Sequence, residues 1–230
     1  MERHFDNELN ALKERLLTMA SHAEAAVNQS VQALTTRDLD LALRVKDNDS
    51  VIDQFEIEID DLAIHLLAKA PLASDLRFVT VAMKISQNLE RVGDEAAKIA
   101  KRARDLSKEP PLKLAVDLPK MAGLALEMLK AALDAFVQGD PAAARALIPQ
   151  DKVVDALHKE IQRRLTAQMT ENAETITRSL HLLVAAKSLE RIADHATNIA
   201  EEVVYLCEAH DIRHPGNGLP ESGPRALQSL

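Results

Sequence analysis

The sequence predicts an all-α fold made of two tandem three-helix bundles. Three observations predict it: the composition, the spacing of apolar residues and an internal repeat. The 230 residues include six glycines, one tyrosine, four phenylalanines and no tryptophan. Many Ala, Leu, Glu, Asp and Lys with few aromatic residues favour helices over sheets. The chain is long enough to bury a core as one domain or as two.

The first half of the chain predicts three helices. The segment 6–35 is amphipathic and lacks Gly and Pro, and the second helix covers 38–69 until Pro71 ends it. The third helix begins with Ser74 as its expected cap and stops at Pro110. Its apolar residues follow a heptad spacing, which is typical of a helix in a bundle. This apolar stripe consists of Phe78, Ile85, Leu89, Val92, Ala96, Ile99, Ala103 and Leu106.

The second half predicts three more helices in the same order. They cover 117–138, 141–172 and 175–210, with a turn at Gly139 and Asp140. Pro149 lies inside the fifth helix and is expected to kink it.

The two halves form an internal repeat. At an offset of 100 residues, the segment 89–91 (Leu-Glu-Arg) matches 189–191, and Asp94 matches Asp194. At an offset of 102, Arg37-Asp38 matches Gly139-Asp140 and Ile52 matches Val154. The two-residue slip falls in the turn before the third helix, where length changes are tolerated. The expected units are a first bundle at 1–110, a second at 111–210 and a disordered tail at 211–230, with the bundles side by side.

Charge and composition exclude several classes of function. The net charge of −8 and the 2% of aromatic residues argue against a nucleic-acid partner. The charged N-terminus lacks a signal peptide, and no run of roughly 18 apolar residues predicts a membrane helix. A single cysteine, Cys207, suits a reducing compartment, and we expect a buried structural thiol rather than a nucleophile. A cytoplasmic protein without membrane insertion is the expectation.

Paired carboxylates recur in both halves. Spacing of four places both members of a pair on one helix face, where like charges repel each other by a few tenths of a kcal/mol. Solvent screening or a bound cation relieves this repulsion. The pairs lie beside or opposite the apolar stripes and are expected to be accessible. They are Asp49 with Asp53, Glu90 with Asp94, Asp151 with Asp155, and Glu190 with Asp194.

Two interpretations of these pairs remain open. One is a solvated acidic surface. The other is a metal site whose oxygen ligands select iron, Mn²⁺ or Mg²⁺ and suit zinc less well. Asn198 extends the second set, and His195 and His158 offer nitrogen ligands.

The segments LERVGDEAAKIA (89–100) and LERIADHATNIAEEV (189–203) follow helices that contain DSVIDQFEIEI and DKVVDALHKEI. In these motifs and in its helix layout over residues 5–210, the chain resembles the PhoU family of bacterial phosphate-transport regulators. The resemblance implies two three-helix bundles, a homodimer and metal binding through the acidic motifs. The ligands it implies are Asp49, Asp53, Glu56, Glu90, Asp94, Asp151, Asp155, Glu190, Asp194 and Asn198.

One position departs from the repeated motif. Lys98 stands where the second half has Asn198, and its ammonium group can pair with Asp94 in place of a metal. His158 likewise stands where the first half has Glu56. The first site is therefore the more doubtful of the two.

The resemblance implies a regulator rather than an enzyme. It would link the ATPase subunit of the phosphate ABC transporter to the phosphate-sensing histidine kinase and repress the phosphate-starvation response. No organic cofactor is expected. A metal-free helical scaffold is the first alternative. A di-metal carboxylate enzyme is the second, although the sequence lacks the Glu-x-x-His motif of such centres.

Overall fold

The computed structural model describes residues 2–69, 73–112 and 116–213. Within these ranges the regular structure is helical and no strand occurs. The elements are α1 (Glu2–Thr36), α2 (Leu39–Leu67), α3 (Ala73–Ser107), α4 (Leu118–Gln138), α5 (Pro141–Leu147), the 3₁₀ helix η1 (Ile148–Gln150), α6 (Asp151–Glu171), the 3₁₀ helix η2 (Ala173–Thr175) and α7 (Ile176–Glu208).

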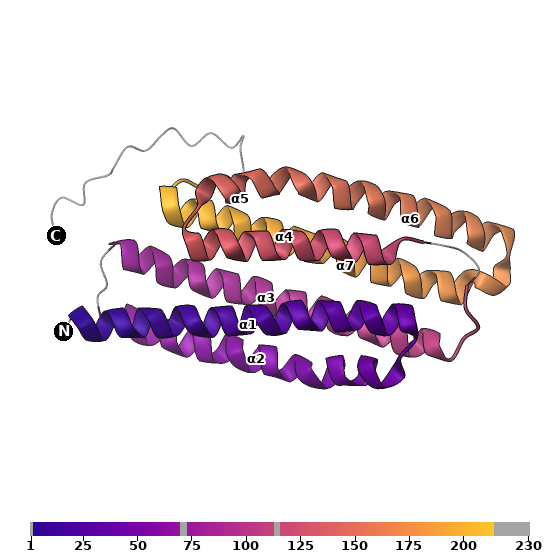
Figure 1. Ribbon diagram of the computed structural model, residues 1–230, viewed down its shortest axis with the longest axis horizontal. Helices are drawn as coiled ribbons and strands as arrows, with labels where there is room; N and C mark the ends of the chain where they lie inside the picture. Colours follow the sequence, from indigo (N-terminus) through magenta and orange to yellow (C-terminus); the bar gives the residue numbers. More distant parts are fainter. Residues whose placement is uncertain (1, 70–72, 113–115, 214–230) are drawn as a thin grey trace.

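The helices form two three-helix bundles that lie side by side, as predicted. Figure 1 shows α1, α2 and α3 as one bundle and α4, α5–α6 and α7 as the other, with their long axes roughly aligned. The bundles meet mainly where α3 packs on α7, and also where α1 packs on α4. The repeated Leu-Glu-Arg helices, α3 and α7, are therefore neighbours at the junction of the two halves.

Two local predictions concern the helix boundaries. At Pro149, where a kink is predicted, the 3₁₀ helix η1 interrupts the fifth helix between α5 and α6. Proline cannot donate a backbone hydrogen bond and clashes with the preceding turn, which explains the interruption. The predicted cap at Ser74 is wrong. Because α3 already begins at Ala73, Ser74 lies inside its first turn, and its hydroxyl contacts Asp75 at 3.4 Å.

The repeat extends to the backbone conformation of the turns that precede α2 and α5. Arg37 and Gly139, which the repeat aligns, both have positive φ, 60° and 62°. Glycine adopts this conformation without strain, whereas arginine does not. The Arg37 guanidinium donates hydrogen bonds to the carbonyls of Leu106 and Glu109, which compensate for the strain and tie this turn to the end of α3. The next residue caps each following helix: Asp38 accepts from the Leu41 amide at 2.9 Å, and Asp140 accepts from two amides of α5.

The apolar stripe of the third helix forms the centre of the core. Its members from Ile85 to Leu106 are buried, and Phe78 is half-buried against Phe136 of α4. In α2, Ile52, Ile59 and Leu66 are buried. The buried residues of both bundles form one continuous apolar cluster, so the halves share a core.

The predicted burial of Cys207 is wrong, because its side chain is exposed. Cys207 lies in the last turn of α7, which ends at Glu208, and the apolar register stops being buried just before it: Val204 is buried and Leu206 is half-buried. The apolar spacing of α7 therefore continues in the sequence past the last residues of the helix that are buried.

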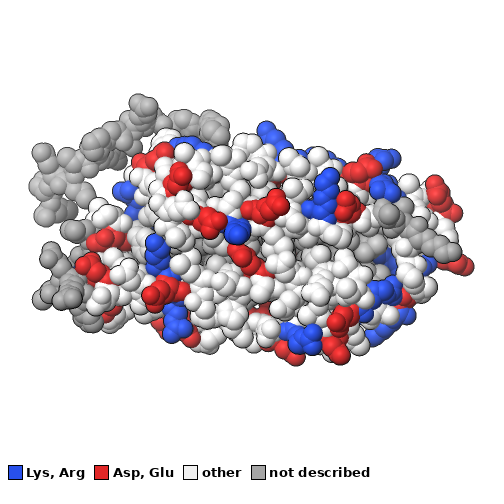
Figure 2. Space-filling model, viewed as in Figure 1, with Lys and Arg blue, Asp and Glu red and all other residues white. Residues whose placement is uncertain are grey.

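The surface carries interspersed charges of both signs. Figure 2 shows acidic and basic side chains intermixed over one face. Within the described residues, none of the helices combines the length and the hydropathy needed to cross a bilayer. The predicted disordered tail, apart from residues 211–213, lies outside the described residues. In the described part of the tail, Arg213 pairs with Glu202 of α7 at 3.0 Å.

Candidate functional site

The predicted acidic residues of the first half lie together, at the surface where α2 packs on α3. Asp49, Asp53 and Glu56 are on α2, and Glu90 and Asp94 are on α3. Asp53 and Asp94 are exposed, whereas the other three are half-buried, so none belongs to the core. We call these five residues the first acidic cluster.

Mutual repulsion inside the first acidic cluster alters its protonation. Partial burial raises the pKa of Asp49, and the charges of Asp53 and Asp94 raise it further. Burial, then Asp60 and Asp53 of the same helix, raise the pKa of Glu56, whereas Arg91 of α3 opposes the rise. Burial, then Asp94, Glu56 and Asp53, raise the pKa of Glu90. Carboxylates from both helices therefore interact across the α2–α3 interface.

Lys98 forms an ion pair with a member of this cluster. Its Nζ lies 3.6 Å from Asp94 Oδ2 and 3.0 Å from Glu95 Oε1. The expected pairing of Lys98 with Asp94 is confirmed. Because Glu95 is buried and Lys98 is half-exposed, the ammonium group is held on the side of the cluster that faces α7.

The second half forms an equivalent cluster between α6 and α7. We call Asp151, Asp155, Glu190 and Asp194 the second acidic cluster. Burial and the charges of Glu190 and Asp151 raise the pKa of Asp194 to about 6. Burial, with Asp155 and Glu190, also raises the pKa of Asp151. The Lys187 ammonium pairs with Glu190, so one carboxylate of this cluster has a cationic partner on its own helix.

Asn198 lies at the junction of the bundles, where it lines one pocket with Asp194 and with Asp94 of the first acidic cluster. Its amide donates to Asn88 Oδ1 of α3 at 3.3 Å, and His195 Nδ1 lies 3.0 Å from the same oxygen. Burial and then the charge of Arg91 lower the pKa of His195, which favours the neutral ring. Both side chains are thus engaged with α3. His158 is half-buried on α6.

A row of ion pairs between α3 and α7, which the sequence did not reveal, surrounds this junction. The buried Glu95 accepts from Arg191 at 3.1 Å, and the buried Glu202 accepts from Lys84 at 3.1 Å. Glu95 Oε1 also accepts from Lys98, whereas Glu95 Oε2 has no hydrogen-bond partner among the residues that the structure describes. The sequence did contain a sign that Glu95 is buried, since it lies next to Ala96 of the apolar stripe. Its partner could not be identified before the pairing of α3 with α7 was known.

The two acidic clusters contain the oxygen ligands that a metal site needs, but among the described residues these ligands do not converge on one point. Carboxylate oxygens suit Mg²⁺, Mn²⁺ or iron. However, no three Asp, Glu, His or Cys side chains in the described parts of the chain converge closely enough to hold one ion. The exposed carboxylates of Asp53, Asp94 and Asp194 would have to rotate to complete such a site. The arrangement as it stands is two strongly anionic surface clusters that flank a polar junction.

Comparison with known proteins decides the family. The family model described as "PhoU domain" matches twice, at residues 16–103 and 118–203. The chain belongs to the PhoU family. The two matches correspond to the two bundles, and the family resemblance seen in the repeated motifs is confirmed.

Relatives of the PhoU family match this chain over nearly their whole length. A phosphate-specific transport system accessory protein PhoU homolog from Pseudomonas aeruginosa is 39% identical over 94% of this chain and 90% of its own. The homolog from Rhizobium meliloti is 41% identical over 88% and 86%. The phosphate-specific transport system accessory protein PhoU of Escherichia coli is 35% identical over 92% and 88%.

Two crystal structures share the fold. PhoU from Pseudomonas aeruginosa superposes with a TM-score of 0.87 at 39% identity, over 90% of this chain and 100% of that one. The phosphate transport system regulatory protein PhoU from Streptococcus pneumoniae gives 0.85 at 31% identity, over 90% and 99%. The predicted architecture of two helical bundles is therefore that of the family.

Proposed function

We propose that this protein is an accessory regulator of high-affinity phosphate uptake that represses the phosphate-starvation response when phosphate is plentiful. The observation that carries the proposal is the match of both bundles to the PhoU domain, with relatives named as accessory proteins of phosphate-specific transport. The role is regulatory and not catalytic, and it places the protein on the cytoplasmic side of the transporter.

The proposed mechanism is that of an adaptor. One surface contacts the ATPase subunit of the phosphate ABC transporter, and another contacts the phosphate-sensing histidine kinase. The shared core and the buried ion pairs of Glu95 and Glu202 join the two bundles, so a contact on one bundle can be transmitted as a rigid displacement of the other. The bundles also present different charges, because Lys98 faces the first acidic cluster where the second half has Asn198.

The two acidic clusters are the proposed metal-dependent element. A cation bound there would supply charge neutralisation and would draw two helices together. The pKa values of Asp49 and Asp194 are raised first by burial and then by neighbouring carboxylates, and the repulsion between carboxylates is what a bound cation would remove. The pairing of Lys98 with Asp94 favours the metal-free alternative for the first cluster, in which the ammonium group takes the place of the ion.

A homodimer is the proposed assembly. Ile57 and Ile64 support it, because they lie one heptad apart on α2 with 56% and 61% of their surface exposed. Exposed apolar residues in such a row are typical of surfaces that bind other proteins. Light scattering coupled to size-exclusion chromatography would measure the mass in solution.

A reporter assay tests the proposed function in cells. The gene would be deleted in its own host, and a phosphatase reporter for phosphate starvation would be measured in phosphate-rich medium. We expect the reporter to become active on deletion and to be silenced again when the wild-type gene is restored. A reporter that stays silent in the deletion strain would contradict the repressor role.

A further inference from the structure

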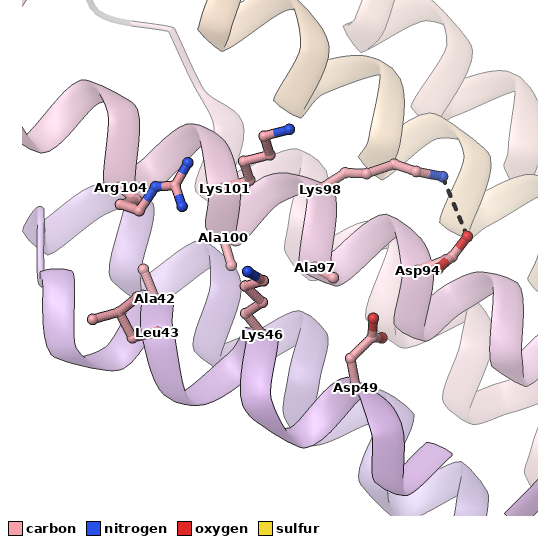
Figure 3. A pocket seen from close by; sticks show the side chains of 10 residues that line it. All are labelled: Ala42, Leu43, Lys46, Asp49, Asp94, Ala97, Lys98, Ala100, Lys101 and Arg104. Atoms are coloured by element: carbon pink, nitrogen blue, oxygen red, sulfur yellow. Dashed lines mark ion pairs between the residues drawn. The ribbon is translucent and has the colours of Figure 1, made fainter. Parts of the chain in front are cut away.

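A basic groove between α2 and α3 has no place in the proposed adaptor mechanism. Its volume is about 380 Å³, within the range of pockets that hold small ligands. Figure 3 shows Lys46 extending from α2 toward α3, and Lys98 extending along α3 toward Asp94. The groove is lined by Ala42, Leu43, Lys46, Asp49, Asp94, Ala97, Lys98, Ala100, Lys101 and Arg104.

Small side chains create the hollow. Ala42 on α2 and Ala97 and Ala100 on α3 face each other across the groove, where longer residues would fill the space. Four cations stand around these alanines, while Asp49 and Asp94, which belong to the first acidic cluster, line one end of the groove. The lining therefore carries an excess of positive charge in a protein whose net charge is −8.

Among the described residues, two of the four cations in the groove already pair with carboxylates of the protein, and two do not. Lys98 is held by Asp94 and Glu95, and Arg104 uses its Nε and Nη2 on Asp105. Lys46 and Lys101, in contrast, form neither a hydrogen bond nor an ion pair within the described part of the chain, although both line the groove. Their ammonium groups and the remaining amino group of Arg104 are available to a ligand.

The spacing of the cations suits an anion with several oxygens. Lys98, Lys101 and Arg104 follow one another at intervals of three along α3, which spans about 9 Å of the helix axis. Lys46 approaches from the opposite wall. In this view Lys101 extends away from Lys46, so its flexible side chain would have to turn toward the groove for both helices to contact one small anion. The lining holds no aromatic side chain, so a nucleotide base would find nothing to stack on.

The second half provides an internal comparison. The positions that match Lys46, Lys98, Lys101 and Arg104 are occupied by Ile148, Asn198, Glu201 and Val204. Three charges are lost and one is reversed, although the carboxylates that match Asp49 and Asp94 remain. The basic groove is therefore a property of the first bundle and not of the repeated scaffold.

We propose that this groove binds a small phosphate-bearing anion. Phosphate oxygens accept charge-assisted hydrogen bonds from ammonium and guanidinium groups, and their charge density matches several cations at once. Asp49 and Asp94 would repel an anion from their end of the groove, so the anion would bind at the basic end. This binding does not depend on the proposed adaptor role, because it involves the isolated protein.

Calorimetric titration tests the proposal. Orthophosphate and pyrophosphate would each be titrated into the wild-type protein and into a Lys46→Gln, Lys101→Gln double variant. A Lys120→Gln, Lys159→Gln variant is the matched control, since it removes the same charge from exposed lysines of the second bundle. We expect saturable binding of one or both anions, weakened about ten-fold or more in the groove variant and changed less than about two-fold in the control.

Three results would overturn the proposal. They are the absence of saturable binding to the wild-type protein, equal weakening in both variants, and binding of citrate as tight as that of the phosphate compounds. Circular dichroism of each variant would verify that helicity is unchanged. Since no transporter or kinase is present in the titration, its failure is distinct from a failure of the reporter assay.

Discussion

Gly93 of α3 lies directly against Ile52 of α2. A Cβ added to Gly93 would lie 2.8 Å from Ile52 Cδ1 and 3.4 Å from its Cγ2. The repeat places Ala193 and Val154 at the equivalent positions of the second bundle, so one methyl group is gained on one helix and one is lost on the other. The two halves thus differ by complementary changes in side-chain size at these aligned positions.

This relationship predicts an energetic coupling between the two positions. Ile52→Val alone is expected to cost about 0.5–1.5 kcal/mol of stability, because it leaves a small cavity. Gly93→Ala gains about 1 kcal/mol of helix propensity and loses as much or more to crowding. The double variant should be about 1 kcal/mol more stable than the sum of the two single effects predicts, because Val lacks the Cδ1 atom that the new Cβ would crowd. Urea denaturation of the four proteins gives this coupling, and additivity within about 0.3 kcal/mol would contradict the packing described.

Gly123 of α4 offers the matched control. A Cβ there would meet nothing within 4 Å, so Gly123→Ala should stabilise the protein by about 1 kcal/mol. A destabilising effect of Gly123→Ala would show that crowding against Ile52 is not what distinguishes Gly93 from Gly123.

The buried carboxylate of Glu95 should be needed to hold the two bundles together. Glu95→Ala removes the partner of Arg191 and Lys98, and we expect a loss of about 2–3 kcal/mol. Glu127→Ala, at an exposed position of α4, should change stability by less than about 0.5 kcal/mol. Equal, small effects of both changes on the urea midpoint would mean that the Glu95 ion pairs contribute nothing.

The raised pKa of Asp194 predicts a pH-dependent loss of stability in chelator-treated protein. The folded state holds this proton up to a pKa of about 6, whereas the unfolded chain releases it near 3.8. Proton binding therefore favours the folded state below pH 3.8, and this contribution is lost as the pH rises to about 6. Asp194→Asn should then stabilise the protein at pH 7.5, on the order of 1 kcal/mol after solvent screening, and much less at pH 4.

Thermal melts of both proteins between pH 4 and pH 8 measure the difference. Asp61→Asn, on the exposed face of α2 and outside both clusters, serves as the control. A melting difference for Asp194→Asn that does not grow with pH would contradict the burial and the carboxylate repulsion that raise the pKa of Asp194.

Metal content should distinguish the two acidic clusters. Protein purified without a tag or chelator would be analysed by inductively coupled plasma mass spectrometry, beside Asp94→Ala and Asp194→Ala variants. We expect iron, manganese or magnesium, with the larger loss on Asp194→Ala because Lys98 already neutralises Asp94. Wild-type protein that stays metal-free after incubation with each cation would contradict metal binding by both acidic clusters and would support the metal-free alternative.

Much of the fold follows from sequence because the repeat and the heptad spacing are local patterns. The stripe from Ile85 to Leu106 is buried as expected, and the interruption at Pro149 follows from the chemistry of proline. The exposure of Cys207 could not be predicted, because a periodic pattern does not show where the neighbouring helix ends.

The composition of each acidic cluster was also predictable, since spacing of four places carboxylates on one face. The engagement of Asn198 and His195 with Asn88, and of Glu95 with Arg191, was not. These contacts join residues about a hundred positions apart. They require the packing of α3 on α7, which no local pattern specifies.

Binding of the purified protein to the ATPase subunit of the phosphate ABC transporter tests the central claim most directly. The ATPase subunit would be immobilised and the association followed by biolayer interferometry, with an unrelated transporter ATPase as the control. The adaptor account predicts saturable binding to the phosphate transporter subunit alone, and binding of the histidine kinase to the resulting complex. No binding to the ATPase subunit, or equal binding to the control, would contradict it.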